Sequence, residues 1–263
     1  MVIDVTTFNG EEELFEIRYH ILKDFVDEFR VVEFDQTFSG KPKEFTFTAI
    51  KEKYPKVKYW PIDETVWSKY KDLAISSPNT EYGKGAEHWV REFCQKESIK
   101  DCLTDLNVED VLFIGDCDEI WNPKHKYVRL PLKLQLQVYS YYLDNRSNEQ
   151  FWGTLVVQYK DIKDQCLNHL RSDTKHRTEK YPSGIVLGWH FTSMGGAENV
   201  KKKLTDSYTS DSYASPQVIS NLESNINANK DFLARDFNYT KDISEWPPYL
   251  KDNRLKYLHL LKP

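Results

Sequence analysis

Short apolar runs separated by amphipathic segments fill the first 120 residues, and this alternation restricts the possible folds most. The runs are VIDVTTF, FRVVEFD, KVKYWPI and DVLFIGD, at residues 2–8, 29–35, 56–62 and 110–116. Each has the length and composition of a buried strand. Helical spacing predicts a helix at residues 11–26, with an apolar face of Leu14, Ile17, Ile21, Leu22 and Phe25. The order strand, helix, strand, strand favours an α/β fold built on a nucleotide-binding sheet.

The rest of the chain is less regular. A second helix is predicted at residues 85–99, with an inward face of Trp89, Val90, Phe93 and Cys94. Further strands are expected at residues 130–144, 151–162 and 185–194, a polar loop at 172–184, and helices at 197–208 and 215–229. Ser215 is the expected N-cap of the last helix. We therefore predict a single domain, residues 1–263, with a nucleotide-binding half at 1–120 and an acceptor and catalytic half at 121–263.

The charge and the termini exclude several classes of partner. The net charge is −5, from 36 basic and 41 acidic residues, and such a balance gives no attraction to nucleic acid or anionic membranes. The segment MVIDVTTFNG lacks the features of a signal peptide, and no run reaches the length of a transmembrane helix. The four cysteines form no CxxC pair. We expect a cytoplasmic protein, in a bacterial cytosol or in the cytosol of a virus-infected host cell.

The stretch VLFIGDCDEIW, residues 111–121, ends a predicted buried strand in carboxylates. Asp116 and Asp118 are spaced to bind one Mg²⁺ or Mn²⁺ and to leave positions for phosphate oxygens. A charged turn without a ligand is the alternative. Nucleotide-sugar glycosyltransferases and aspartate-nucleophile phosphatases both place such a motif at a strand end. The phosphatase pattern is weaker here, because Ile120 occupies the position of its threonine.

A second group of residues lies in GWHFTSMGGAE, at positions 188–198. His190 ends a predicted strand and is a candidate third metal ligand, although a hydrogen-bonded core histidine is the alternative. Gly195 and Gly196 permit a tight turn. Glu198 then begins a helix, either as a proton acceptor or as a partner of the helix dipole.

Two further charged segments have simpler explanations. Arg235 either neutralises a diphosphate or forms an ion pair with Asp231, four residues earlier. The run Lys201, Lys202 and Lys203 is interpreted as a solvated helix face.

Taken together, these segments resemble glycosyltransferase family 17, the β-1,4-N-acetylglucosaminyltransferases and their microbial or viral relatives. The similarity runs through FNGEEELFEIRYHIL, VDEFRVVEFDQTFSGKPKEFTF, DVLFIGDCDEI and GWHFTSMGGAENVKKKL to the final YLHLL. The resemblance implies a GT-A fold, a divalent metal, a UDP-sugar donor with GlcNAc as the default sugar, and inversion at the anomeric carbon. The acceptor would be an oligosaccharide or a glycoprotein.

The resemblance also assigns roles to individual residues. Asp116 and Asp118 match the family's DxD motif, with Asp116 toward both metal and ribose, and His190 matches the histidine of its GWH motif. Glu33 falls in a donor-side motif in which Phe34 replaces a serine. For the general base we favour Glu198, with Glu119 as the rival. A non-catalytic carbohydrate- or nucleotide-binding module is the alternative function.

Overall fold

The computed structural model describes residues 1–77, 86–125, 130–178, 185–208 and 213–263, and these residues contain one mixed sheet of nine strands. The strand order is β3-β2-β1-β4-β7-β6-β8-β5, and β9 pairs with β7. The strands are β1 Val2–Phe8, β2 Glu28–Phe34, β3 Val57–Ile62, β4 Val111–Asp116, β5 Glu119–Trp121, β6 Leu132–Ser140, β7 Asn145–Gln158, β8 Gly188–Thr192 and β9 Tyr239–Lys241.

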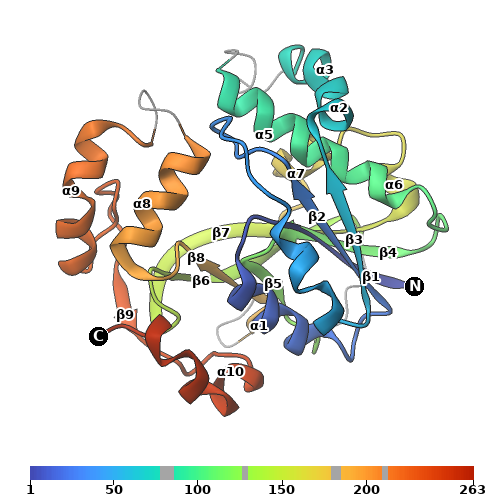
Figure 1. Ribbon diagram of the computed structural model, residues 1–263. Coiled ribbons are helices and arrows are strands. Elements are labelled where there is room, and N and C mark those ends of the chain that lie inside the picture. Colours follow the sequence, from blue (N-terminus) through green and yellow to red (C-terminus); the bar gives the residue numbers. More distant parts are fainter. Residues whose placement is uncertain (78–85, 126–129, 179–184, 209–212) are drawn as a thin grey trace.

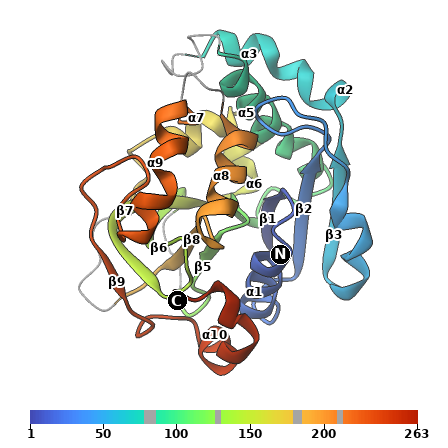
Figure 2. The same cartoon turned by 60° about the vertical axis from the view of Figure 1, so that its left-hand side comes forward.

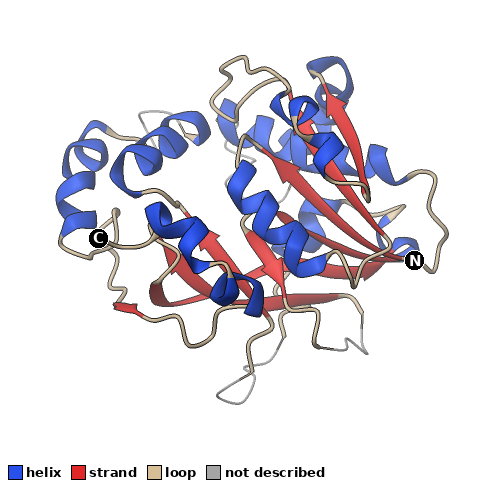
Figure 3. Ribbon diagram, turned by 60° about the horizontal axis from the view of Figure 1, so that its bottom comes forward, coloured by secondary structure: helices blue, strands red, loops and turns tan. Residues whose placement is uncertain are grey.

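Helices flank this sheet, as Figure 3 shows with helices in blue and strands in red. The α-helices are α1 Glu12–Leu22, α2 Glu64–Trp67, α3 Lys71–Ile75, α5 Glu87–Ser98, α6 Tyr159–Ile162, α7 Leu167–Ser172, α8 Gly196–Ser207, α9 Pro216–Asn227 and α10 Pro248–Asp252. Short 3-10 helices are η1 Thr46–Ala49, η2 Lys51–Lys53, η3 Ser68–Tyr70, η4 Ile99–Leu103 and η5 Arg254–Leu260. None of the helices in the described ranges is long and apolar enough to cross a membrane.

Strands β1, β2, β3 and β4 are parallel, so their carboxyl ends meet at one edge of the sheet. Ligands of open α/β sheets bind outside that edge. Strand β7 then runs antiparallel to both β4 and β6, which joins the two predicted halves in one sheet. The predicted α/β class, with a central sheet between helices, is confirmed.

Two apolar layers cover the two faces of the sheet. On one face, a cluster of buried side chains joins α1, η5 and α10 to the sheet and includes Phe15, Ile17 and Leu250, with α10 lying against α1. On the other face, α5 and α7 pack against β1, β4 and β7 through side chains that include Phe93 and Leu167. These buried side chains explain why the sheet forms where the sequence has its apolar runs.

Helices α8 and α9 pack on each other through a third apolar cluster, which includes Val200, Leu204 and Leu222. Figures 1 and 2 show this pair in orange, and Tyr208, just after α8, contacts Trp89 of α5 with ring centroids 5.7 Å apart. Ser215 caps α9 as predicted, because its side chain accepts a hydrogen bond from Val218 N.

A loop after β2, residues 35–43, contacts both α5 and α8. Arg91 of α5 donates a hydrogen bond to the Phe38 carbonyl oxygen over 2.6 Å. Ser39 donates its N–H to the Asp206 carbonyl oxygen of α8 over 2.9 Å, and its hydroxyl to that of Thr205 over 3.0 Å. The loop therefore ties α5 to α8.

Three predictions about the helices need correction. Phe25 does not lie on the buried face of the first helix, because α1 ends at Leu22 and the Phe25 side chain is 51% exposed. Trp89 and Val90 of α5 are only half-buried, whereas Phe93 and Cys94 are buried. The loop predicted at 172–184 begins with the last residue of α7, a helix that the sequence reading missed, and its residues 179–184 lie outside the described residues.

Candidate active site

The predicted Asp-x-Asp segment forms the turn between β4 and β5 at the carboxyl edge of the parallel strands. Arg18 of α1 supports this turn from the protein interior. Its Nη1 donates hydrogen bonds to the carbonyl oxygens of Asp116, over 3.1 Å, and Glu119, over 2.6 Å. The sequence reading did not single out Arg18, although it lies on the apolar face of the predicted helix, beside Leu14 and Ile17. A charged residue on the apolar face of a helix is unusual, and this feature of the sequence could have identified Arg18.

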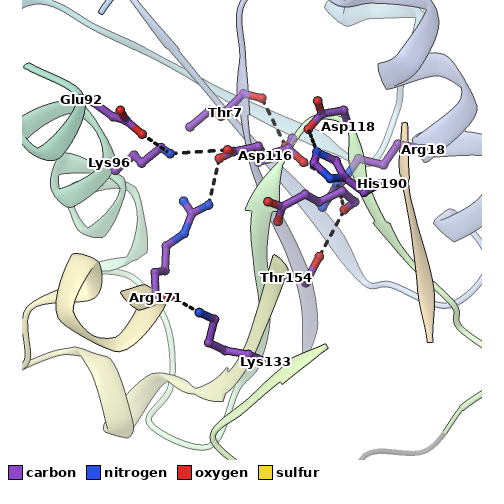
Figure 4. A network of polar contacts seen from close by, with 12 residues as sticks. Thr7, Arg18, Glu92, Lys96, Asp116, Asp118, Lys133, Thr154, Arg171 and His190 are labelled. Atoms are coloured by element: carbon purple, nitrogen blue, oxygen red, sulfur yellow. Dashed lines mark hydrogen bonds and ion pairs between the residues drawn. The ribbon is translucent and has the colours of Figure 1, made fainter. Parts of the chain in front are cut away.

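The Asp116 carboxylate lies between two cations from different helices. Arg171 Nη2 is 3.0 Å from its Oδ1, and Lys96 Nζ is 3.5 Å from its Oδ2 (Figure 4). Burial raises the pKa of Asp116, but Lys96 and Arg171 lower it more, so the net pKa lies well below its ordinary value. Asp116 is therefore ionised at neutral pH.

Helix α7, which carries Arg171, is fixed at both ends. At its start, the buried carboxylate of Glu97 accepts hydrogen bonds from Leu167 N over 3.1 Å and from Asn168 N over 3.1 Å. At its end, the buried Lys133 donates to the Arg171 carbonyl oxygen. Burial and the nearby arginines lower the pKa of Lys133 to about 8. The guanidinium of Arg171 is thereby presented to Asp116.

The Asp118 carboxylate has a different pair of cationic partners. Its Oδ1 lies 3.5 Å from His190 Nε2, and its Oδ2 lies 3.0 Å from Lys203 Nζ of α8. Burial raises the pKa of Asp118, yet Lys203 and His190 outweigh burial and hold it far below its ordinary value. The structure thus brings together Asp118 and His190, two of the residues predicted to bind one metal ion. Lys201, Lys202 and Lys203 are all exposed, as predicted, and Lys203 in addition forms this ion pair with Asp118.

His190 projects from β8, and its ring stacks on Phe151 with centroids 4.1 Å apart. Burial lowers the pKa of His190, and Asp118 raises it by more, so the net pKa is above the ordinary value. Its Nδ1 has no hydrogen-bond partner within the described part of the chain. Nε2 of the imidazole therefore faces Asp118, whereas Nδ1 is left without a partner among the described residues.

Glu119 is buried beside this pair, and its backbone lies opposite that of His190 in the β5–β8 ladder. Its side chain packs against Gly115 and Gly153, where an added Cβ would lie 2.8 Å from Glu119 Oε2 and Cδ respectively. Burial and the charge of Asp116 raise the pKa of Glu119 to about 7. Its Oε2 lacks a hydrogen-bond partner among the described residues. Glu119 can therefore take up or release a proton near neutral pH.

The remaining predicted site residues lie elsewhere. Glu198 is exposed in the first turn of α8 and forms no hydrogen bond or ion pair with any described residue. The Glu33 carboxylate is buried and accepts hydrogen bonds from Thr46, Phe47 and Tyr59. Arg235 forms the ion pair with Asp231 that was one of its two predicted roles, at 2.8 Å.

A cleft of about 360 Å³ opens beside Asp118, between the N-terminal turn of α1 and helix α8. Glu11, Asn199, Lys202 and Lys203 are among its lining residues. Gly195 and Gly196, at φ 91° and 75°, make the turn that begins α8, as predicted. The cleft gives a ligand direct access to Asp118 and Lys203.

The donor atoms at Asp118 fit a divalent cation that retains several water ligands. Within the described ranges, no three His, Cys, Asp or Glu residues converge as a closed metal cage. Asp118 and His190 would supply two ligands, and water and phosphate oxygens the others. Asp116, the other predicted carboxylate ligand, faces Lys96 and Arg171 in this structure.

Comparisons with known proteins test the resemblance independently. No curated protein matches this sequence. One solved structure that is similar to it is the apo form of mouse xyloside xylosyltransferase 1, with 7% identity, a TM-score of 0.32, and coverage of 63% of this chain and 69% of that chain. The sequence model of glycosyltransferase family 17 matches residues 1–191, which include the Asp-x-Asp turn and His190. The chain therefore belongs to glycosyltransferase family 17.

Proposed function

We propose that this chain transfers a sugar, GlcNAc by default, from a UDP-sugar to a hydroxyl group of an oligosaccharide or glycoprotein, with inversion and with the help of Mn²⁺ or Mg²⁺. The supporting observation is the position of Asp118, which holds His190 and Lys203 at the mouth of a cleft on the carboxyl edge of the parallel strands. Nucleotide ligands of α/β sheets bind at this edge.

The charges around the turn suit a diphosphate leaving group. Lys96 and Arg171 stand on one side of the turn, and Lys203 stands on the other. Asp118 and His190 would hold the metal, which would neutralise negative charge on the departing UDP. Arg18 keeps the turn in place through its two backbone contacts.

Inversion requires a carboxylate that removes a proton from the acceptor hydroxyl. We propose Glu119 for this role, in preference to Glu198. Glu119 has a pKa of about 7, and its buried Oε2 has no hydrogen-bond partner among the described residues. Its backbone pairs with that of His190, and a base is most effective when its pKa lies near the working pH. The exposed Glu198 has no contact with this cluster.

Two variants test this assignment. Glu119→Gln should retain UDP binding, measured by calorimetry, and should lower turnover at saturating donor by about 10²–10⁴-fold. Glu198→Gln is the matched control and should keep most of the activity. A slow Glu198→Gln enzyme beside an active Glu119→Gln enzyme would reverse the assignment.

Metal and donor binding are tested by thermal shift with nucleotide sugars, with and without Mn²⁺. The native protein should be stabilised by UDP-sugars in a chelator-sensitive manner, and Asp118→Ala should lose this response. Stabilisation by UDP without any turnover would instead favour a non-catalytic binding module. For the stereochemistry, an α-linked donor should give a β-linked product by NMR, and an α-linked product would exclude inversion.

A further inference from the structure

Lys203 occupies the position at Asp118 that a bound cation would need. Its Nζ lies 3.0 Å from Asp118 Oδ2, and it also donates to Thr192 Oγ1 over 3.4 Å. The Asp118 side chain is only 11% exposed, so its charge requires a partner when no ligand is bound. Lys203 supplies that partner from a helix whose neighbouring lysines face solvent.

The Lys203 side chain is free to leave this position. It is 46% exposed and lines the cleft of about 360 Å³ together with Asn199 and Lys202. A lysine side chain has a flexible stem of four carbons, so its ammonium group can move while α8 stays in place. The backbone of α8 is held independently, by the packing of Val200 and Leu204 on α9.

We propose that Lys203 is a built-in, exchangeable counter-ion of Asp118: it competes with a divalent cation for this carboxylate and, once released, binds the diphosphate of the donor in the cleft. This inference rests on the proposed function and adds a second role to one side chain. The double charge of a divalent cation at Asp118 would repel the ammonium group of Lys203, so occupation by a metal drives the ammonium group away. The cleft is the open space next to it, and an anionic diphosphate there would attract it.

Removal of the Lys203 charge should increase the affinity of the protein for a divalent cation. Lys203→Met keeps the length of the side chain but removes the competing charge. Calorimetry or electron paramagnetic resonance should therefore show Mn²⁺ binding to the nucleotide-free variant roughly tenfold or more tightly than to the native protein, a difference of about 1.4 kcal/mol. In saturating Mn²⁺, the same variant should bind UDP more weakly, by a similar factor.

Lys201→Met is the matched control, because it removes the same charge from the same helix at an exposed position. It should leave both affinities within about twofold of the native protein. Circular dichroism and thermal melting confirm that each variant is folded. Uridine, which lacks phosphates, should not distinguish Lys203→Met from the native protein.

The outcomes separate the inference from the proposed function. If the native protein binds Mn²⁺ and UDP but Lys203→Met has unchanged or weaker Mn²⁺ affinity, the exchange is wrong and the proposed function stands. An equal gain in Mn²⁺ affinity for Lys201→Met would show a general charge effect and also overturn the exchange. If neither the native protein nor any variant binds Mn²⁺ or UDP, both proposals fail.

Discussion

Arg18 and Asp4 form a fully buried ion pair beneath the Asp-x-Asp turn. Arg18 Nε lies 2.7 Å from Asp4 Oδ1, and Nη2 lies 2.8 Å from Oδ2, so the ion pair is bidentate. Trp121 adds a third hydrogen bond to Asp4, over 2.8 Å. Because Asp4 satisfies two of the nitrogens, the third is directed at the backbone of the turn. The buried pair therefore fixes the position of the carboxylates above it.

Arg18→Met should destabilise the protein by about 3–5 kcal/mol, because it leaves the Asp4 charge buried without its partner. Urea denaturation followed by circular dichroism measures this cost. Arg254→Met, at an exposed arginine, is the control and should stay within about 0.5 kcal/mol of the native protein. Equal stability of the two variants would show that the buried ion pair does not stabilise the folded protein.

His190 should change its protonation when Asp118 loses its charge. In the native protein, the pKa of His190 is raised because the attraction of Asp118 exceeds the opposing effect of burial. Asp118→Asn removes the attraction and leaves the burial, so the pKa should fall below its ordinary value. NMR titration of the imidazole in chelator-treated buffer measures the change. Asp252→Asn, an exposed substitution, should have no such effect, and a His190 pKa that stays raised in Asp118→Asn would contradict the assignment.

Glu119 should make the protein less stable as pH rises from about 4.5 to about 7. The unfolded chain releases this proton near its ordinary pKa of 4.5, whereas the folded chain keeps it until about 7. The folded state therefore binds more protons within this window, and the free energy of unfolding decreases with pH at about 1.4 kcal/mol per unit. Glu119→Gln should lose this decline. Parallel pH profiles of unfolding for the two proteins would refute the raised pKa.

Glu97→Gln should cost about 1.5–3 kcal/mol, because hydrogen bonds to a charged group become neutral ones. The variant weakens the contacts with Leu167 N and Asn168 N and the ion pair with Lys100 at 2.6 Å. Chemical denaturation measures the loss. Glu87→Gln is a control from the same helix, since the Glu87 side chain is 90% exposed, and it should change stability by less than about 0.5 kcal/mol. If the two variants lose the same stability, Glu97 does not anchor α7.

The parallel part of the sheet could be predicted from the sequence, because strands buried on both faces are apolar throughout. The positions of β1, β2, β3 and β4 agree with their predicted ranges to within one or two residues. Strand β5 has only three residues and α7 has six, and elements this short carry no periodic signal. Their places depend on partners far away in the chain.

The acidic residues of the candidate site could be predicted from the sequence, whereas its basic residues could not. Asp116, Asp118 and Glu119 follow an apolar strand, which is an unusual position for charge. Arg171 and Lys203 lie on helices, where charged residues normally face water, so nothing in their sequence context marked them. Glu198 was favoured as the base because it follows a Gly-Gly turn. A helix start at a turn does not determine which way its side chains point.

The distance along the chain between the charges of the site has a consequence for synthesis. Arg171 follows Asp116 by 55 positions, and Lys203 follows Asp118 by 85. Strand β5 also pairs with β8, which follows it in the chain and is therefore synthesised later. Contacts this distant in sequence form slowly, and the N-terminal part of a chain leaves the ribosome first. A nascent chain thus carries two ionised aspartates before most of their counter-charges exist, and the candidate site is completed only by the later-made half of the protein.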